Sequence, residues 1–232
     1  HRQAKEALIE KVNKLTGIGL GPAVFTIGFA RRAAVYKRAE LLFWDTARLI
    51  EIAKNVGPFQ LVYAGKAHPQ DTAGKEVIRR IHETKEALKG KIKMVYLEDY
   101  GIDLAKLITS GVALWLNTPQ PPLEASGTSG MKAAANGVPS LSILDGWWGE
   151  GCIEGVTGWA IGGDKDASME SRDTRAEDAH ALYNKLEMII LPMFCNEPDR
   201  YAEVMRHSIA LNASFFNTER MLSQYITKAY FK

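Results

Sequence analysis

The chain has 232 residues, of which 46% are hydrophobic, so it can form one large or two small domains with a hydrophobic core. A formal net charge of +2 gives no reason to expect a nucleic-acid or membrane partner, and any basic site must be local. The two cysteines show no metal-ligand spacing with the five histidines. We therefore expect reduced thiols, a cytoplasmic protein and no metal site.

The chain begins directly in a helical pattern, residues 2–17, without an initiator methionine. This start predicts a segment of a longer protein. No signal-peptide pattern opens it, and no apolar run approaches the roughly 20 residues of a membrane span.

Short β-rich runs then alternate with helical stretches. The expected buried strands are residues 23–29, 59–64, 92–97, 112–116 and 140–144. One helical face is expected from Leu42, Thr46, Leu49 and Ala53, and another from Val77, Ile81, Thr84 and Leu88. This succession predicts an α/β fold with a Rossmann-like, doubly wound parallel sheet, whose ligands lie at the carboxyl ends of the strands.

The last third of the chain changes character after residue 162. Residues 163–177 are predicted to form a polar surface loop, and three helical segments follow. Leu182, Leu186, Ile189 and Met193 form the apolar face of the first segment, Pro192 is expected to end or kink it, and Pro198 to open the next. We expect a single domain over residues 1–232, with residues 174–232 as a helical C-terminal extension.

The segment EASGTSGMKAAANG, residues 124–137, carries the strongest functional signal. Gly127 and Gly130 let the backbone approach a ligand, and the neighbouring hydroxyl residues can cap the following helix. Free amides at a helix start make a seat for an anion such as a phosphate, with Lys132 about one turn away. On spacing alone, an ordinary loop that caps a helix is an equal alternative.

Better-known phosphate motifs do not fit. A P-loop needs Ser or Thr after its lysine, whereas Ala133 follows Lys132. Residues 17–21, GIGLG, precede a strand where the dinucleotide fingerprint should follow one. Both this segment and the Gly65-Lys66 dipeptide are therefore predicted to form turns rather than phosphate sites.

A basic run forms the second informative segment, with Arg31, Arg32, Lys37 and Arg38 at the end of the first expected strand. Arg32 and Lys37 together could hold a second anion that faces the glycine-rich loop. The alternative is a solvated, basic helix entry, although cations at a helix start oppose the helix dipole.

Four segments together resemble the α-glucan (glycogen or maltodextrin) phosphorylases of the shorter bacterial and archaeal type. They are ARRAAVYKRAELL (30–42), YAGKAHP (63–69), MVYLEDYGIDLA (94–105) and EASGTSGMKAAANGVPSLSILDGWW (124–148). The resemblance covers most of the chain and implies the C-terminal, cofactor-binding domain of a two-domain GT-B glycosyltransferase, with the N-terminal domain absent.

The resemblance also implies roles for individual residues. Lys132 would carry pyridoxal 5′-phosphate as a Schiff base, and Arg32 and Lys37 would bind the substrate phosphate. The remaining cofactor contacts would be Arg31, Tyr100, Gly127, Thr128 and Ser129, and the glucosyl contacts would be Glu124, Ala125, Ser126 and Gly127. Arg31 stands where the family has a lysine, and Gly101 where its larger members have an arginine.

The implied reaction is phosphorolysis of α-1,4-glucan by inorganic phosphate to α-glucose 1-phosphate, with the cofactor phosphate as proton shuttle. The isolated chain is expected to have little or no activity, because substrate would lie between it and the missing N-terminal domain. A sugar-nucleotide-dependent GT-B transferase and a non-enzymatic cofactor-binding or assembly module are the alternatives, and a homo-oligomer is left open.

Other conspicuous residues are expected to be structural. We expect Trp147 and Trp148 to pack in a core or interface rather than stack on sugar. His68, His82, His180 and His207 are expected at the surface with no catalytic role.

Overall fold

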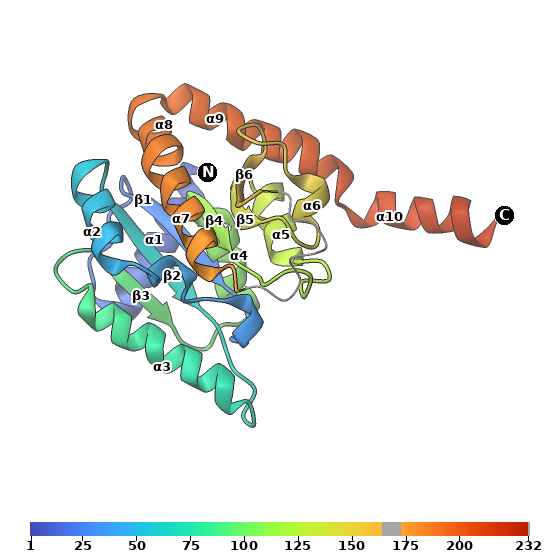
Figure 1. Ribbon diagram of the computed structural model, residues 1–232. Coiled ribbons are helices and arrows are strands. Elements are labelled where there is room, and N and C mark those ends of the chain that lie inside the picture. Colours follow the sequence, from blue (N-terminus) through green and yellow to red (C-terminus); the bar gives the residue numbers. More distant parts are fainter. Residues whose placement is uncertain (164–172, 232) are drawn as a thin grey trace.

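A computed structural model describes residues 1–163 and 173–231, and within them six parallel strands form one sheet in the order β3-β2-β1-β4-β5-β6 (Figure 1). The strands are β1 (Phe25–Ala30), β2 (Phe59–Ala64), β3 (Met94–Leu97), β4 (Leu114–Asn117), β5 (Ser140–Ile143) and β6 (Gly158–Ile161). Phe25 pairs with Phe59, and Ile27 pairs with Leu114. This is the doubly wound, Rossmann-like sheet that the sequence predicted.

Helices connect and follow these strands. The α-helices are α1 (Arg2–Thr16), α2 (Thr46–Asn55), α3 (Thr72–Ala87), α4 (Ile102–Gly111), α5 (Thr128–Ala135), α6 (Trp148–Gly151), α7 (Arg175–Lys185), α8 (Leu191–Asn196), α9 (Pro198–His207) and α10 (Thr218–Tyr225). Short 3₁₀ turns are η1 (Val35–Lys37) and η2 (Leu41–Phe43), and π-helical turns are η4 (Leu186–Ile190), η5 (Ser208–Ala213) and η6 (Ile226–Tyr230). Side-chain caps fix the starts of three described helices, because Asp45 accepts a hydrogen bond from the Arg48 amide, Asp71 from the Gly74 amide and Asn217 from the Arg220 amide.

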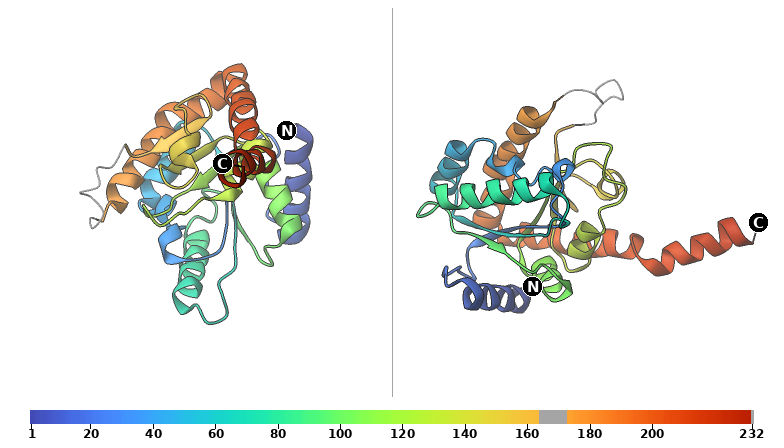
Figure 2. Two further views of the ribbon diagram at one scale, coloured as in Figure 1. Left: turned by 90° about the vertical axis from the view of Figure 1, so that its right-hand side faces the viewer. Right: turned by 90° about the horizontal axis from the view of Figure 1, so that it is seen from below.

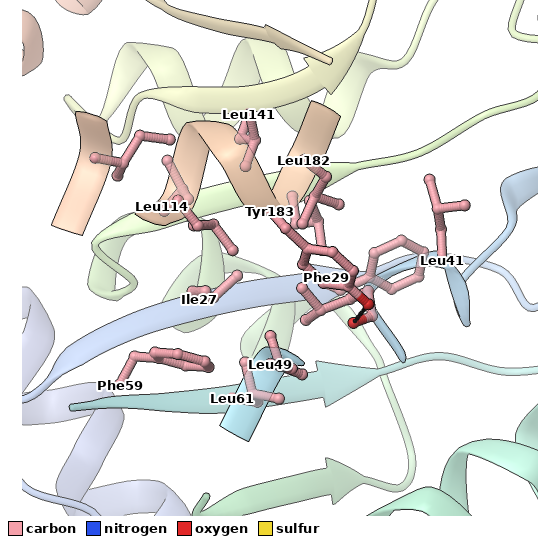
Figure 3. Close-up of a cluster of buried hydrophobic side chains, with 14 of the residues drawn as sticks. Ile27, Phe29, Leu41, Leu49, Phe59, Leu61, Leu114, Leu141, Leu182 and Tyr183 are labelled. Atoms are coloured by element: carbon pink, nitrogen blue, oxygen red, sulfur yellow. Dashed lines mark hydrogen bonds between the residues drawn. The ribbon is translucent and has the colours of Figure 1, made fainter. Parts of the chain in front are cut away.

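Two hydrophobic clusters cover the two faces of the sheet. Because side chains alternate along a strand, Leu61 belongs to one cluster and Val62 to the other. The larger cluster includes Leu49 of α2 and Leu182 of α7, and Figure 3 shows both against strand side chains such as Ile27 and Leu114. The second cluster packs α1, α4 and α5 on the opposite face. Helices on both faces leave the two ends of the sheet for ligands.

Several sequence expectations need correction at their limits. The strand β6 was not predicted, and the strands begin later than expected: β1 at Phe25, β3 at Met94 and β4 at Leu114. Leu42 lies in η2 rather than in the helix that holds Leu49, although both are buried. The helix starting at Arg175 takes three residues from the expected loop at 163–177, of which 164–172 lie outside the described residues.

The helical segments after residue 174 pack partly on the sheet. The chain stays helical through Pro192, because the π-helical turn η4 leads directly into α8, so this proline does not end the segment. Pro198 opens α9, as predicted.

The end of the chain extends away from the body: Figures 1 and 2 both show α10 directed outward from the sheet. None of the residues of α10 or η6 is buried. Their exposed apolar side chains include Met221, Leu222, Tyr225 and Tyr230. Across residues 1–163 and 173–231, no helix has both the length and the hydrophobicity that a membrane span requires.

Candidate active site

The basic run and the glycine-rich loop meet where the strand order of the sheet reverses. The strands β1 and β4 are neighbours, although β2 and β3 separate them in sequence. Arg31 directly follows β1, and the chain that leaves β4 leads to Glu124. In doubly wound sheets the crevice at such a switch point is the usual ligand site.

A buried cluster of charges occupies this position. The guanidinium of Arg31 donates through Nη2 to Glu124 Oε2 at 2.5 Å, and Lys37 Nζ donates to the same oxygen. The side chains of Arg31 and Lys37 are each 8% exposed, and that of Glu124 is 7% exposed. One carboxylate therefore serves two desolvated cations, and the cluster retains an excess positive charge.

Burial and pairing act against each other on these groups. Burial favours the neutral form of Glu124, but hydrogen bonding from Lys37 and the charge of Arg31 outweigh it and lower the pKa of the carboxyl. Burial also lowers the pKa of Arg31, which Glu124 opposes. Because an arginine stays protonated in proteins, the result is a desolvated cation that favours a second anion.

Arg31 also carries hydrogen-bond donors that its contact with Glu124 does not use. Its Nε and Nη1 atoms are buried, and neither has a hydrogen-bond partner within the described part of the chain. Tyr100 lies close by: its hydroxyl donates to the carbonyl of Ala30 at 3.4 Å, and burial raises its pKa while Arg31 opposes the rise. Buried unpaired donors are costly, so Arg31 is a candidate for contact with a ligand oxygen.

The glycine-rich loop leads into α5, which begins at Thr128. Its N-cap residue is Gly127, with φ 88°, a conformation that favours glycine, and the helix has no side-chain cap. The first amides of α5 therefore remain for an external acceptor. Lys132 lies on the exposed surface of this helix, and its Nζ is 3.4 Å from the hydroxyl of Thr128.

Contacts that sequence reasoning missed hold this loop in place. Asp145 accepts a hydrogen bond from the Glu124 amide through Oδ2 and one from the Gly146 amide through Oδ1, each at 2.9 Å. The amide of Trp147 donates to the carbonyl of Ser126 at 2.8 Å. The turn after β5 thus anchors both ends of the 124–126 segment, and only the Asp-Gly pair in the sequence hinted at a turn.

Not every predicted site residue joins the cluster. Arg32 is exposed, and the ring of the neighbouring Tyr36 lies 4.4 Å from Lys37 Nζ; Lys37 first, and Arg32 to a smaller extent, lower the pKa of the Tyr36 hydroxyl. Ala125 and Thr128 are exposed, while Ser126, Gly127 and Ser129 are half-buried. The sequence brought these residues to one edge of the sheet but did not predict that Lys37 would be buried against Glu124.

The residues expected to be structural mostly are. Trp147 and Trp148 are 3% and 0% exposed, so they pack in the interior as predicted. Of the four discounted histidines, only His82 is partly covered, and its ring contacts Tyr96. Among residues 1–163 and 173–231, no three His, Cys, Asp or Glu side chains gather into a group that could hold a metal ion.

The fold and the site together define a doubly wound α/β domain with a buried, net-positive charge cluster at its switch point. A family model described as carbohydrate phosphorylase matches residues 1–228, and the chain belongs to this family. It is 44% identical to a maltodextrin phosphorylase of Thermococcus litoralis over 89% of the chain and 25% of that protein. It is 42% identical to a glycogen phosphorylase of Aquifex aeolicus over 100% of the chain and 34% of that protein.

A glycogen phosphorylase of Mycobacterium tuberculosis is 37% identical over 90% of the chain and 25% of its own length. The chain thus spans about a quarter to a third of these relatives. These findings favour a phosphorylase domain over a sugar-nucleotide-dependent transferase.

Proposed function

We propose that the chain is the pyridoxal-phosphate-binding part of an α-glucan phosphorylase, which converts α-1,4-glucan and inorganic phosphate into α-glucose 1-phosphate. The observation that carries this proposal is the buried Arg31–Lys37–Glu124 cluster beside the uncapped start of α5. These features supply two neighbouring sets of groups suited to anions. The proposed reaction requires two such sets, because the cofactor phosphate and the substrate phosphate must lie side by side to exchange a proton.

The donor set fits the cofactor. The unpartnered Nε and Nη1 of Arg31 and the first amides of α5, at Thr128 and Ser129, are suited to phosphate oxygens, and Lys132 supplies an exposed amine for the aldehyde. Tyr100 would lie near the pyridoxal ring. The chemistry that the cofactor supplies when bound is a phosphate group that exchanges a proton with the substrate phosphate.

The remaining roles belong to binding and charge neutralisation. Lys37 and the exposed Arg32 would hold inorganic phosphate, and Lys37 would exchange its contact with Glu124 for a phosphate oxygen. Glu124, released in part, and the 125–127 backbone would then contact hydroxyls of the glucosyl unit. Positive groups in a water-poor site neutralise the negative charge of the phosphates that must lie side by side while the glycosidic bond breaks.

A second wall of the site, on the side of the substrate that faces away from this domain, is needed to exclude water. Relatives three to four times longer than this chain have the length to supply it, and the uncovered apolar residues of α10 and η6 support a further body packed beside the domain. We expect little or no release of glucose 1-phosphate from maltodextrin by this chain alone. Addition of the remaining portion of the Aquifex aeolicus relative should restore turnover, and rapid turnover by the chain alone would refute the need for a second wall.

Cofactor attachment gives a test that does not depend on turnover. After incubation with pyridoxal 5′-phosphate and reduction with borohydride, mass spectrometry should find the added mass on the peptide that contains Lys132. The Lys132→Ala variant should take up none, while Lys54→Ala, which removes an exposed lysine of α2, should label like the parent. Labelling spread evenly over surface lysines would contradict the proposal, as would equal labelling of Lys132→Ala.

A further inference from the structure

Arg38, the last cation of the basic run, has no role in the site described so far, yet it is among the most constrained residues of the chain. Its backbone has φ 46°, in the left-handed region that a branched or long side chain rarely adopts. Its side chain is 6% exposed and donates in three directions: Nε to Thr118 O at 2.9 Å, Nη2 to Pro119 O at 2.8 Å, and Nη1 to Asp178 Oδ2 at 2.8 Å. Each of the three guanidinium nitrogens thus donates one hydrogen bond.

Hydrogen bonds are donated in both directions between the η1 turn, with Arg38 at its end, and the segment that follows β4. The hydroxyl of Thr118 lies within hydrogen-bond distance of the carbonyls of Lys37 and Arg38, at 3.1 and 3.0 Å. The amide of Gln120 donates to the carbonyl of Tyr36 at 2.7 Å. The turn that carries Lys37 is therefore bonded to the segment that continues to Glu124.

This network fixes the distance between two charged groups of the anion site. Lys37 directly precedes Arg38, and Glu124 follows Thr118 by a few residues, so the two ends of the Lys37–Glu124 ion pair are held by the same set of hydrogen bonds. A buried arginine on a strained backbone is a costly way to join two segments that apolar packing could join. Such strain persists where the surrounding structure fixes the geometry, and it gathers at functional sites.

We propose that Arg38 is a positioning residue, which holds the Lys37 ammonium at the place where inorganic phosphate binds. This inference rests on the proposed function of Lys37. The network does not include α5, so cofactor attachment at Lys132 should not depend on Arg38. Loss of Arg38 should thus separate two properties that a general loss of folding would reduce together.

The test compares Arg38→Lys with the parent after loading with pyridoxal phosphate. Lysine keeps the charge but cannot donate to all three acceptors. Binding of inorganic phosphate is measured by titration calorimetry, and cofactor attachment by borohydride reduction and mass spectrometry. We expect the dissociation constant for phosphate to rise by about tenfold or more, with attachment at Lys132 unchanged.

Arg48→Lys is the matched control, because Arg48 also ties a helix to the C-terminal segment, through Glu187 and Asn184, but does not touch the η1 turn. It should leave phosphate affinity unchanged even where it lowers the unfolding midpoint. If Arg38→Lys fails to fold, Thr118→Val, which removes only the hydroxyl contacts to the turn, should show the same selective loss of phosphate binding.

Three outcomes would overturn the inference: phosphate affinity unchanged in the folded Arg38→Lys or Thr118→Val variant, equal loss in Arg48→Lys, or loss of phosphate binding only in parallel with cofactor attachment. A parent that binds phosphate but attaches no cofactor at Lys132 would refute the proposed cofactor site, while the comparison of phosphate affinities would still decide the role of Arg38. A parent that binds no phosphate would refute the phosphate-binding role of Lys37 and, with it, the role of Arg38.

Discussion

Substitution of Glu124 by glutamine should turn the site into one whose stability depends on an added anion. Glutamine matches the size of the side chain but removes the charge shared by Arg31 and Lys37, which are each 8% exposed. Loss of one partner of a buried ion pair typically costs about 3–5 kcal/mol. For a domain of this size, about 1 kcal/mol moves the unfolding midpoint by roughly 2–4 °C, so we expect a decrease of about 6–20 °C.

Inorganic phosphate should restore much of this loss. Phosphate at about 100 times its dissociation constant adds roughly 2.7 kcal/mol to the free energy of unfolding. The gain should be larger in Glu124→Gln than in the parent, because in the parent Glu124 already neutralises the cations. Thermal unfolding followed by circular dichroism, in phosphate and in chloride of matched ionic strength, measures both effects.

The stabilisation that Glu124 provides should also depend on pH, and it should decrease in acid. Burial opposes the ionisation of Glu124, but Lys37 and Arg31 prevail and hold its pKa below the ordinary value. The stabilisation is therefore fully present above the unfolded pKa, about 4.3, and is lost as the pH falls through the folded pKa. The difference in unfolding midpoint between the parent and Glu124→Gln should therefore become smaller as the pH is lowered.

Glu187→Gln provides the control for this prediction. Its carboxylate pairs with Arg48 at 2.9 Å, but the two side chains are 27% and 35% exposed, so the change should cost no more than about 1 kcal/mol. If Glu124→Gln is as stable as the parent in phosphate-free buffer, or if phosphate stabilises both proteins equally, the reasoning about the buried cluster is wrong.

Two further substitutions test packing and charge elsewhere. A Cβ on Gly130 would lie 2.7 Å from Nε1 of the buried Trp147, so Gly130→Ala should lower the free energy of unfolding, measured in urea, by about 1–3 kcal/mol despite the better helix propensity of alanine. Gly149→Ala is the control, because a Cβ there would meet open space, and equal effects of the two changes would contradict the packing argument. Burial lowers the pKa of Lys5, which donates to the Val24 carbonyl, to about 8. Because the unfolded chain holds this proton up to about pH 10.4, the stability of the parent relative to Lys5→Met should rise between those two pH values, and a flat difference in urea unfolding curves would count against it.

Most strands of the sheet, and the sheet edge at which the candidate site lies, could be predicted from local sequence patterns. Short, mainly apolar and β-rich runs such as 59–64, which contains Gln60 as a polar exception, favour strands buried on both faces, and their alternation with helices favours parallel pairing. Since ligand edges in such sheets lie at the carboxyl ends of strands, Arg31 and Glu124 could be assigned to one edge before any contact was known. Gly127 was expected to let the backbone approach a ligand, and the structure adds that its φ is 88°, a conformation that favours glycine.

The arrangement of those charges depends on long-range contacts that local sequence patterns do not reveal. That one Glu124 oxygen serves both Arg31 and Lys37 depends on β1 lying beside β4, a pairing between segments about 90 residues apart that local pattern does not encode. The same holds for Arg38, which sequence reasoning counted only as one more cation, because its partners Thr118, Pro119 and Asp178 come together through strand order and helix packing. The strand β6 escaped prediction for a related reason, since four residues show too little periodicity and only pairing with β5 defines them. Local sequence fixes which groups are available at an edge, whereas burial and long-range pairing decide which of them neutralise one another and which, like Nε and Nη1 of Arg31, remain for a ligand.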